Sequence, residues 1–261
     1  MLDDNSYVSR HRTCEDVVIV IDIFWTHPDS IKLFNMFPIV LILDSTYKTN
    51  KYRLPLLEMS EKEENVTWAL EVCRTLLKDQ GEMPKVIVIS DNALMNSVAK
   101  VFPTSNALLY RYHMTKNVRS RVKPAVKEKI VFAWTDKVRH LGNTTTNRVE
   151  SAHATLKNWL ENSKNDLCRD WDSMNQMIQN QYNEIQTSFG WSIIVFQHGF
   201  KNNNLYSQLV DNISRAGLNY ICHEAKRADN VSFDSAKCGG IIVKTHGLSC
   251  ACVIAKKDET W

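Results

Sequence analysis

Residues 38–59 read PIVLILDSTYKTNKYRLPLLEM, and this stretch decides which fold the chain is expected to adopt. It begins with a short, partly β-branched apolar run at 39–43, which is typical of a strand buried on both faces. Asp44 follows at once, and polar turn residues then lead to a second expected strand at 53–59. An acid directly after a buried strand lies where a sheet meets solvent, which is a common place for a functional site. The alternative is that Asp44 only accepts hydrogen bonds from the backbone of the turn.

The next segments repeat this pattern of a buried strand followed by an acid. A helix, a strand, a helix and a strand are expected in turn at 66–77, 86–89, 92–102 and 108–110. Asp91 comes just after the second of the two buried strands. This order predicts an α/β fold in which helices flank a sheet, and the ends of neighbouring strands meet at one edge of such a sheet. Asp44 and Asp91 are therefore expected to lie close together.

Glu150 is the candidate for a third carboxylate at this edge. It lies in the first turn of an expected helix that continues through 152–160. Carboxylates gathered at one edge can hold Mg²⁺, which prefers oxygen ligands, and a pair of such ions stabilises the attacking and leaving oxygens of a phosphodiester displacement. The alternative is a capping role, because an acid is favourable near the N-terminus of a helix.

Basic residues cluster at 111–129, where Glu128 is the one acid. Such clustering is an electrostatic signature of nucleic-acid binding, so DNA is the expected partner. A solvated helix face would have the same composition. The residues expected to contact phosphates are Lys116, Arg119, Arg121 and Lys123.

Residues 238–252 contain three cysteines and one histidine. Cys238, His246, Cys250 and Cys252 can supply the four ligands that Zn²⁺ takes in tetrahedral geometry. Their spacing is not that of a common zinc finger, so a chance cluster of reduced thiols is the alternative.

The composition is that of an ordinary globular protein, with 44% apolar and 23% charged residues. No apolar run is long enough to cross a membrane, so no membrane partner is expected. The polar N-terminus does not resemble a secretory signal. The chain has seven cysteines, an odd number, and four of them are scattered, which favours thiols in a reducing compartment over disulfides.

Five motifs together resemble those of plant Mutator-like element transposases and of the far-red-impaired-response regulators derived from them. They are LILDSTYKTNKYRLPLLEM, ALMNSVAKVFP, YRYHMTKNVRSRVKP, TTNRVESAHATLKNWL and CGGIIVKTHGLSCAC, and the resemblance extends over residues from about 23 to 256. The resemblance implies an RNase H-like fold with a DDE triad, followed by a SWIM-type zinc finger. Asp44 and Asp91 match the two aspartates of the triad, Glu150 matches its glutamate, and His113 matches the histidine of the family's Cys-x-x-His element.

The chain also departs from this family at several positions. The acid-rich stretch after Met59 replaces a strand of the central sheet, and a helical insertion beyond Lys123 is cut short. Tyr110 stands at the cysteine of the Cys-x-x-His element, and Gly240 stands at the second cysteine of the zinc finger. Cys252 stands where many SWIM fingers have histidine.

The function expected on this basis is that of a transposase-derived, DNA-binding nuclear protein. Its metal-dependent DNA cleavage and strand transfer are expected to be impaired, because the missing strand should misplace the carboxylates. The alternative is a non-enzymatic transcription regulator that binds DNA and zinc. Either form is compatible with a homo-oligomer.

Four segments are expected along the chain. An N-terminal remnant at 1–30 precedes the shortened RNase H-like core at 31–160. A helical region follows at 161–230, with a break at Phe189-Gly190-Trp191, and the zinc-finger-like element occupies 231–256.

Overall fold

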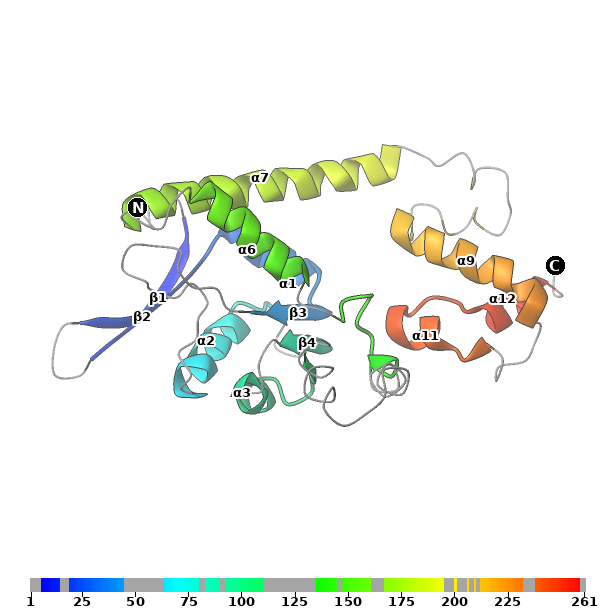
Figure 1. The fold of residues 1–261 in the computed structure, drawn as a ribbon, viewed down its shortest axis with the longest axis horizontal. Helices are drawn as coiled ribbons and strands as arrows, with labels where there is room; N and C mark the ends of the chain where they lie inside the picture. The colour runs from blue at the N-terminus through cyan, green and yellow to red at the C-terminus, as the bar shows by residue number, and fades with distance from the viewer. Residues whose placement is uncertain are drawn as a thin grey trace, which may run out of the picture. The chain divides into compact units, whose positions relative to one another are not determined.

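The computed structural model describes residues 6–14, 19–44, 63–79, 83–89, 93–109, 135–144, 147–160, 167–194, 200, 206, 209, 212–231 and 238–258. They belong to two units, shown in Figure 1. The first unit comprises Met1–Phe132 and Asn143–Tyr182, and the second comprises Ala133–Gly142 and Asn183–Trp261. Helices and small sheets occur together, so the predicted α/β class is confirmed at this level.

A parallel sheet lies at the centre of the first unit. Its described strands are β3 (Val40–Leu43), β4 (Val86–Ile89) and β5 (Asn106–Leu109), in the order β3-β4-β5. All four residues of β4 are fully buried, as its continuous apolar sequence predicts. The prediction that the run at 39–43 is buried on both faces was wrong for β3, whose residues are only half-buried. The reason is that β3 is an edge strand of the described sheet.

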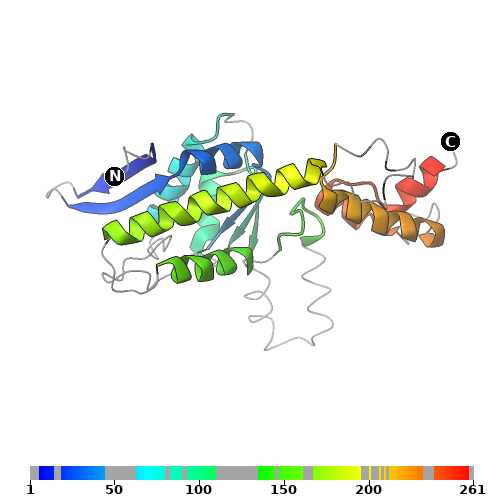
Figure 2. The same cartoon turned by 90° about the horizontal axis from the view of Figure 1, so that it is seen from above.

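Helices cover both faces of this sheet, as Figures 1 and 2 show. On one face lie α2 (Glu63–Thr75) and α3 (Ala93–Val101), which pack against each other. On the other face lie α1 (Pro28–Met36) and α6 (Asn147–Trp159). The core includes Val66, Leu70, Ile87, Ile89, Val98 and Phe102. Burial of each such side chain contributes about 1.5–3 kcal/mol to the stability of this core.

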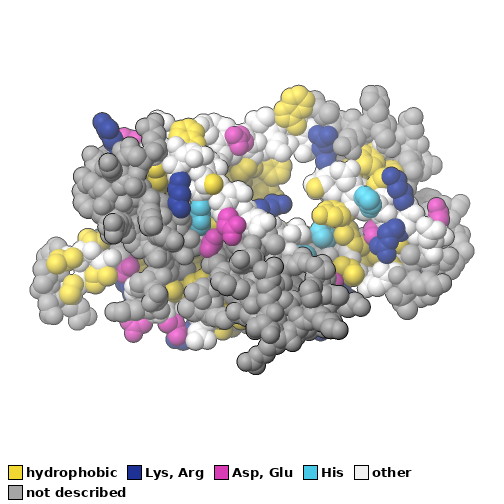
Figure 3. Space-filling view, viewed as in Figure 1, with side chains coloured by type: hydrophobic (Ala, Val, Ile, Leu, Met, Phe, Trp, Pro, Cys, Tyr) yellow, Lys and Arg dark blue, Asp and Glu magenta, His cyan; other side chains and the backbone are white. Residues whose placement is uncertain are grey.

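The N-terminal residues form an antiparallel hairpin of β1 (Val8–Thr13) and β2 (Val20–Thr26). This hairpin lies in the segment at 1–30 that the sequence suggested to be an N-terminal remnant. The strand β1 is mostly polar, so its pairing leaves little apolar signal. Arg12 joins the two strands by an ion pair with Asp22, and its guanidinium lies over the ring of Trp68 on α2. Apolar side chains of β2 remain exposed on the hairpin, as Figure 3 shows.

The longest described helix is α7 (Leu167–Ile194). It passes from the first unit into the second, and Tyr7 donates a hydrogen bond to Asn175 on it. The predicted break at Phe189-Gly190-Trp191 was wrong, because the helix continues through all three residues. A single glycine in a helix interior costs only about 1 kcal/mol, which the neighbouring turns can offset.

The second unit is helical in its described part. It contains α9 (Arg215–Val231), α11 (Ile241–His246) and α12 (Ala251–Asp258), and α9 packs against α12. Leu218 and Ile221 on α9 meet Ile254 on α12 in an apolar cluster. Among the described residues, no helix combines the length and the apolar character needed to cross a membrane.

Candidate functional site

The first candidate site lies where β3 ends beside α6. Asp44 follows β3 directly, and its Oδ2 atom lies 3.8 Å from Nδ1 of His153 on α6. Each of these side chains exposes only 13% of its surface. Glu150 precedes His153 by three residues, so it lies on the same side of the helix. An acid from the sheet and an acid from the helix therefore flank one imidazole.

The charge state of His153 follows from these surroundings. Burial lowers the pKa of His153, and the nearby Lys157 lowers it further. The carboxylates of Asp44 and Glu150 act in the opposite direction without reversing the shift. His153 is therefore a neutral imidazole at neutral pH, and its Nε2 atom is buried without a hydrogen-bond partner among the described residues.

These three residues do not by themselves form a site for Mg²⁺. Their ligand atoms do not come close enough together to form a common metal-binding group in the described part of the chain. Mg²⁺ also prefers oxygen ligands, and the near neighbour of Asp44 is an imidazole nitrogen. The described groups therefore fit this ion poorly.

Several predicted residues lie outside the described residues. They are Asp91, His113, Lys116, Arg119, Arg121 and Lys123. Sequence reasoning missed His153, although its position three residues after Glu150 was a usable signal, since helical residues at that spacing are neighbours.

The second candidate site is a cluster of three buried cysteines, Cys238, Cys250 and Cys252. Their sulfur atoms all lie within 4.8 Å of one another, and the Sγ atoms of Cys250 and Cys252 are 3.4 Å apart. The short helix α11 brings them together, because Gly240 and Gly247 flank it in the left-handed conformation and reverse the chain at both ends. Three close thiols of this kind could bind a metal ion, and thiolate ligands are compatible with Zn²⁺.

The environment favours ionisation of one of these thiols. Burial opposes it, but hydrogen bonds from the backbone N–H groups of Cys252 and Gly240 and from the other two thiols lower the pKa of Cys238 on balance. The hydrogen bond with Cys250, together with burial, raises the pKa of Cys252 to about 11. Cys238 therefore becomes a thiolate, the form that binds metals, more readily than Cys252.

A buried carboxylate holds this cluster against α9. Glu224 Oε2 accepts a hydrogen bond of 2.9 Å from the backbone N–H of Ala251, which lies between two of the cysteines. Its Oε1 atom accepts one from Arg227. Glu224 thus caps the N-terminus of α12 from another helix, a role that local sequence patterns cannot reveal.

The structure does not bring His246 to the thiols, although the sequence suggested it as the fourth ligand. Thr245 Oγ1 donates a hydrogen bond to the carbonyl of Ile241 and lies 2.8 Å from Nδ1 of His246, with which it is also hydrogen-bonded. The Nε2 atom of His246 faces the turn at Gly142. The imidazole lies against the ring of Tyr220, with centroids 4.4 Å apart. Formation of α11 explains this placement. It puts His246 at the end of the helix, where the backbone N–H of Leu141 donates a hydrogen bond to the carbonyl of Thr245.

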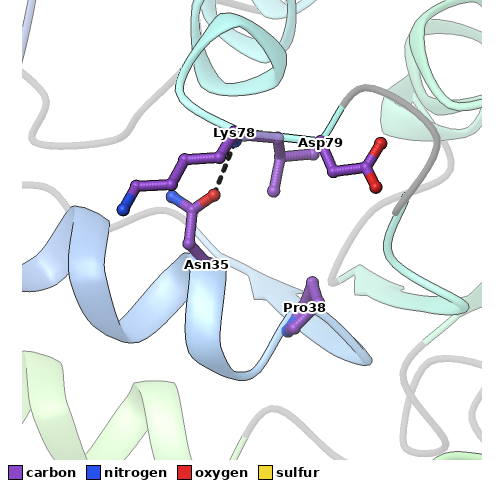
Figure 4. A pocket seen from close by; sticks show the side chains of 5 residues that line it. Asn35, Pro38, Lys78 and Asp79 are labelled. Atoms are coloured by element: carbon purple, nitrogen blue, oxygen red, sulfur yellow. Dashed lines mark hydrogen bonds between the residues drawn. The ribbon is translucent and has the colours of Figure 1, made fainter.

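A pocket of about 230 Å³ lies between the end of α1 and the segment after α2 (Figure 4). Its lining includes Asn35, Pro38, Lys78 and Asp79. The amide of Asn35 bonds the backbone of Leu76 and of Lys78, so it ties the two segments together. Neither Asp44 nor Glu150 lines this pocket, and the amide of Asn35 is used in structural contacts.

The sequence matches no protein-family model and no curated protein, and the structure matches no solved structure. The function is therefore inferred from the residues around Asp44, the cysteine cluster and the motifs of the chain itself.

Proposed function

We propose that this chain is a Mutator-like, transposase-derived DNA-binding protein whose RNase H-like core is shortened and impaired in DNA cleavage. The observation that carries the proposal is the meeting of Asp44 with α6. Asp44 comes directly after a parallel strand, and the helix it meets carries Glu150 and His153. An acid at a strand end opposite an acid on a later helix is the arrangement that the family resemblance implies.

Impairment of cleavage is supported by the neighbours of Asp44. A metal-dependent nuclease must hold its carboxylates within about 0.5 Å of the productive geometry. Here the imidazole of His153 lies 3.8 Å from Asp44, and the described acids do not form a common group for a hard cation. The proposal therefore assigns the chain DNA binding and no cleavage step.

DNA binding is assigned to the basic segment that contains Lys116, Arg119, Arg121 and Lys123. Lysine and arginine side chains bind phosphates and release condensed counterions, so the affinity falls as salt rises. This contact carries no sequence information by itself, so the segment should bind duplexes of different sequence with similar affinity. A protein that acts in this way would work in the nucleus.

The test is a measurement of duplex DNA binding by fluorescence anisotropy over a range of salt concentrations. The triple variant Lys116→Ala, Arg119→Ala, Arg121→Ala should lower the slope of log K against log salt by about 0.9 for each phosphate that is no longer neutralised. A matched control removes the same charge from the exposed residues Lys78, Lys85 and Lys244 and should keep the slope. Absence of binding at low salt, or an equal reduction of the slope in the control, would overturn the proposal.

Cleavage is measured on the same duplex with Mn²⁺ or Mg²⁺. The unmodified chain should leave the DNA intact. Cleavage that disappears in the Asp44→Asn variant would show that the site is active, which would contradict the impairment and retain the transposase ancestry.

A second candidate function is that of a non-enzymatic regulator that binds DNA and zinc. The buried cluster of Cys238, Cys250 and Cys252 favours it, because a metal-held element is a common way to stabilise a small regulatory module. The Cys250→Ser variant separates the two candidates. A regulator that needs its zinc element should lose DNA affinity, whereas binding through the basic segment alone should persist.

A further inference from the structure

We infer that Cys238, Cys250 and Cys252 bind Zn²⁺ through three thiolates and that the fourth coordination position takes an exchangeable neutral ligand, water or a nitrogen donor. Such a site differs from a closed structural zinc finger, in which the protein supplies all four ligands. The three cysteines all lie in the second unit.

The separation of the three sulfur atoms suits one ion. With a Zn–S distance of about 2.3 Å, sulfur atoms on a tetrahedral centre lie about 3.8 Å apart. The observed pair separation of 3.4 Å for Cys250 and Cys252, and the limit of 4.8 Å for the whole cluster, bracket that value. The thiols therefore need only small movements to bind the ion.

Buried contacts hold these thiols in place. Glu224 accepts a hydrogen bond from the backbone N–H of Ala251, which lies between Cys250 and Cys252, and only 7% of Glu224 is exposed. The backbone N–H groups of Gly240 and Cys252 donate hydrogen bonds to the sulfur of Cys238, which helps to fix its position. The site is therefore largely formed before the ion arrives.

Two residues indicate that the fourth position is open. His246 uses Nδ1 to bond Thr245 and directs Nε2 toward Gly142, so it faces its own turn. Gly240, in the turn between Cys238 and α11, has no side chain and therefore supplies no ligand. Within the described residues, the group that can ligate a metal consists of the three cysteines.

The charge of the site selects the class of the fourth ligand. Three thiolates around Zn²⁺ leave a net negative charge, whereas the charge of the nearby Glu224 is compensated by its ion pair with Arg227. An anionic ligand would be repelled by the thiolates, whereas water or an imidazole nitrogen adds no charge. A zinc-bound water that exchanges with neutral nitrogen donors is therefore the expected state.

The test replaces Zn²⁺ with Co²⁺ in the full-length protein and follows the visible spectrum under a phosphine reductant. One Co²⁺ per chain should bind and show thiolate charge-transfer bands, and imidazole should shift the d–d bands in a saturable way. The His246→Ala variant should show the same spectrum and the same shift. The Gly240→Cys variant should lose the shift, because it offers a fourth thiolate, whereas Gly240→Ser should keep it.

Three results would overturn the inference. The Cys250→Ser variant should lose the metal while Cys222→Ser keeps it, and equal retention in both would exclude the three-thiolate site. Circular dichroism of the two variants shows whether either has unfolded. If Cys250→Ser has unfolded, the number of metal ions bound per folded, unmodified chain decides whether the site exists. Absence of any imidazole shift in the unmodified chain would mean that the protein fills the fourth position. A spectrum that changes in His246→Ala would identify that residue as the ligand.

Discussion

Oδ2 of Asp44 lies 3.8 Å from Nδ1 of His153, which joins the end of strand β3 to helix α6 across a long stretch of sequence. The separation is longer than a hydrogen bond, so the two groups interact through charge rather than by sharing a proton. The interaction is strongest when His153 is protonated, and burial opposes that state. The pair is therefore sensitive to pH.

The free energy of unfolding should fall as the pH drops through 6.5, the usual pKa of an imidazole, and His153 contributes to this fall. Burial lowers the pKa of His153 in the folded protein, so the unfolded chain binds a proton that the folded chain does not. Stability therefore rises with pH in this window. Urea unfolding at several pH values should show a shallower fall for His153→Gln than for the unmodified chain. The exposed His11→Gln should keep the original slope, and an unchanged slope in His153→Gln would contradict the prediction.

The core of the first unit should be sensitive to truncation at Ile87. This residue of β4 is fully buried, so Ile87→Ala removes apolar packing and leaves a cavity. The expected loss is about 2–5 kcal/mol in the free energy of unfolding, measured with chemical denaturant. Ile21 on β2 is 58% exposed, so Ile21→Ala should change stability by less than about 0.5 kcal/mol. Similar losses at both positions would argue against the described burial.

Two glycine substitutions should act in opposite directions. Gly190 is within α7, and a Cβ atom there meets nothing within 4 Å, so Gly190→Ala should stabilise by about 0.5–1 kcal/mol. Gly142 has φ +80°, so Gly142→Ala should cost about 1–2 kcal/mol through backbone strain. Thermal unfolding measures both. Destabilisation by Gly190→Ala would indicate that α7 is interrupted there after all.

Glu224 should control the metal affinity of the cysteine cluster without being a ligand. Glu224→Gln removes the buried charge and the pairing with Arg227 while it keeps a carbonyl that can accept from Ala251. Loss of such a positioning group typically lowers metal affinity by about 10–100-fold. Competition with a chromophoric chelator measures the change. The exposed Glu71→Gln should have no effect, and an equal affinity in Glu224→Gln would limit that residue to a structural role.

Strong apolar patterns in the sequence predicted most elements of the α/β unit. The run at 86–89 is strand β4, and the helical spacing at 66–77 corresponds to α2 within a few residues at each end. The hairpin partner β1 could not be predicted in this way, because cross-strand contacts between polar residues leave no periodic signal.

The candidate site could be predicted only where a residue type carries its own chemistry. The cysteines were visible as metal ligands, and the structure brings Cys238, Cys250 and Cys252 together. The positions of His246, His153 and Glu224 depend on how helices turn and pack. These contacts join residues distant in sequence, such as Glu224 with Ala251, so no local pattern reports them.

The second unit is built from two separate stretches of the chain, and this restricts how the protein can be divided into fragments. Leu141 donates its backbone N–H to the carbonyl of Thr245, and the guanidinium of Arg139 lies over Gly247. Both partners come from Ala133–Gly142, in the middle of the chain, so a fragment that starts at Asn183 lacks them. In such a fragment the carbonyl of Thr245 would lose its hydrogen bond from Leu141, and Gly247 at the end of α11 would lose its contact with Arg139. A soluble C-terminal fragment should therefore require the 133–142 segment to be supplied, either by fusion or as an added peptide.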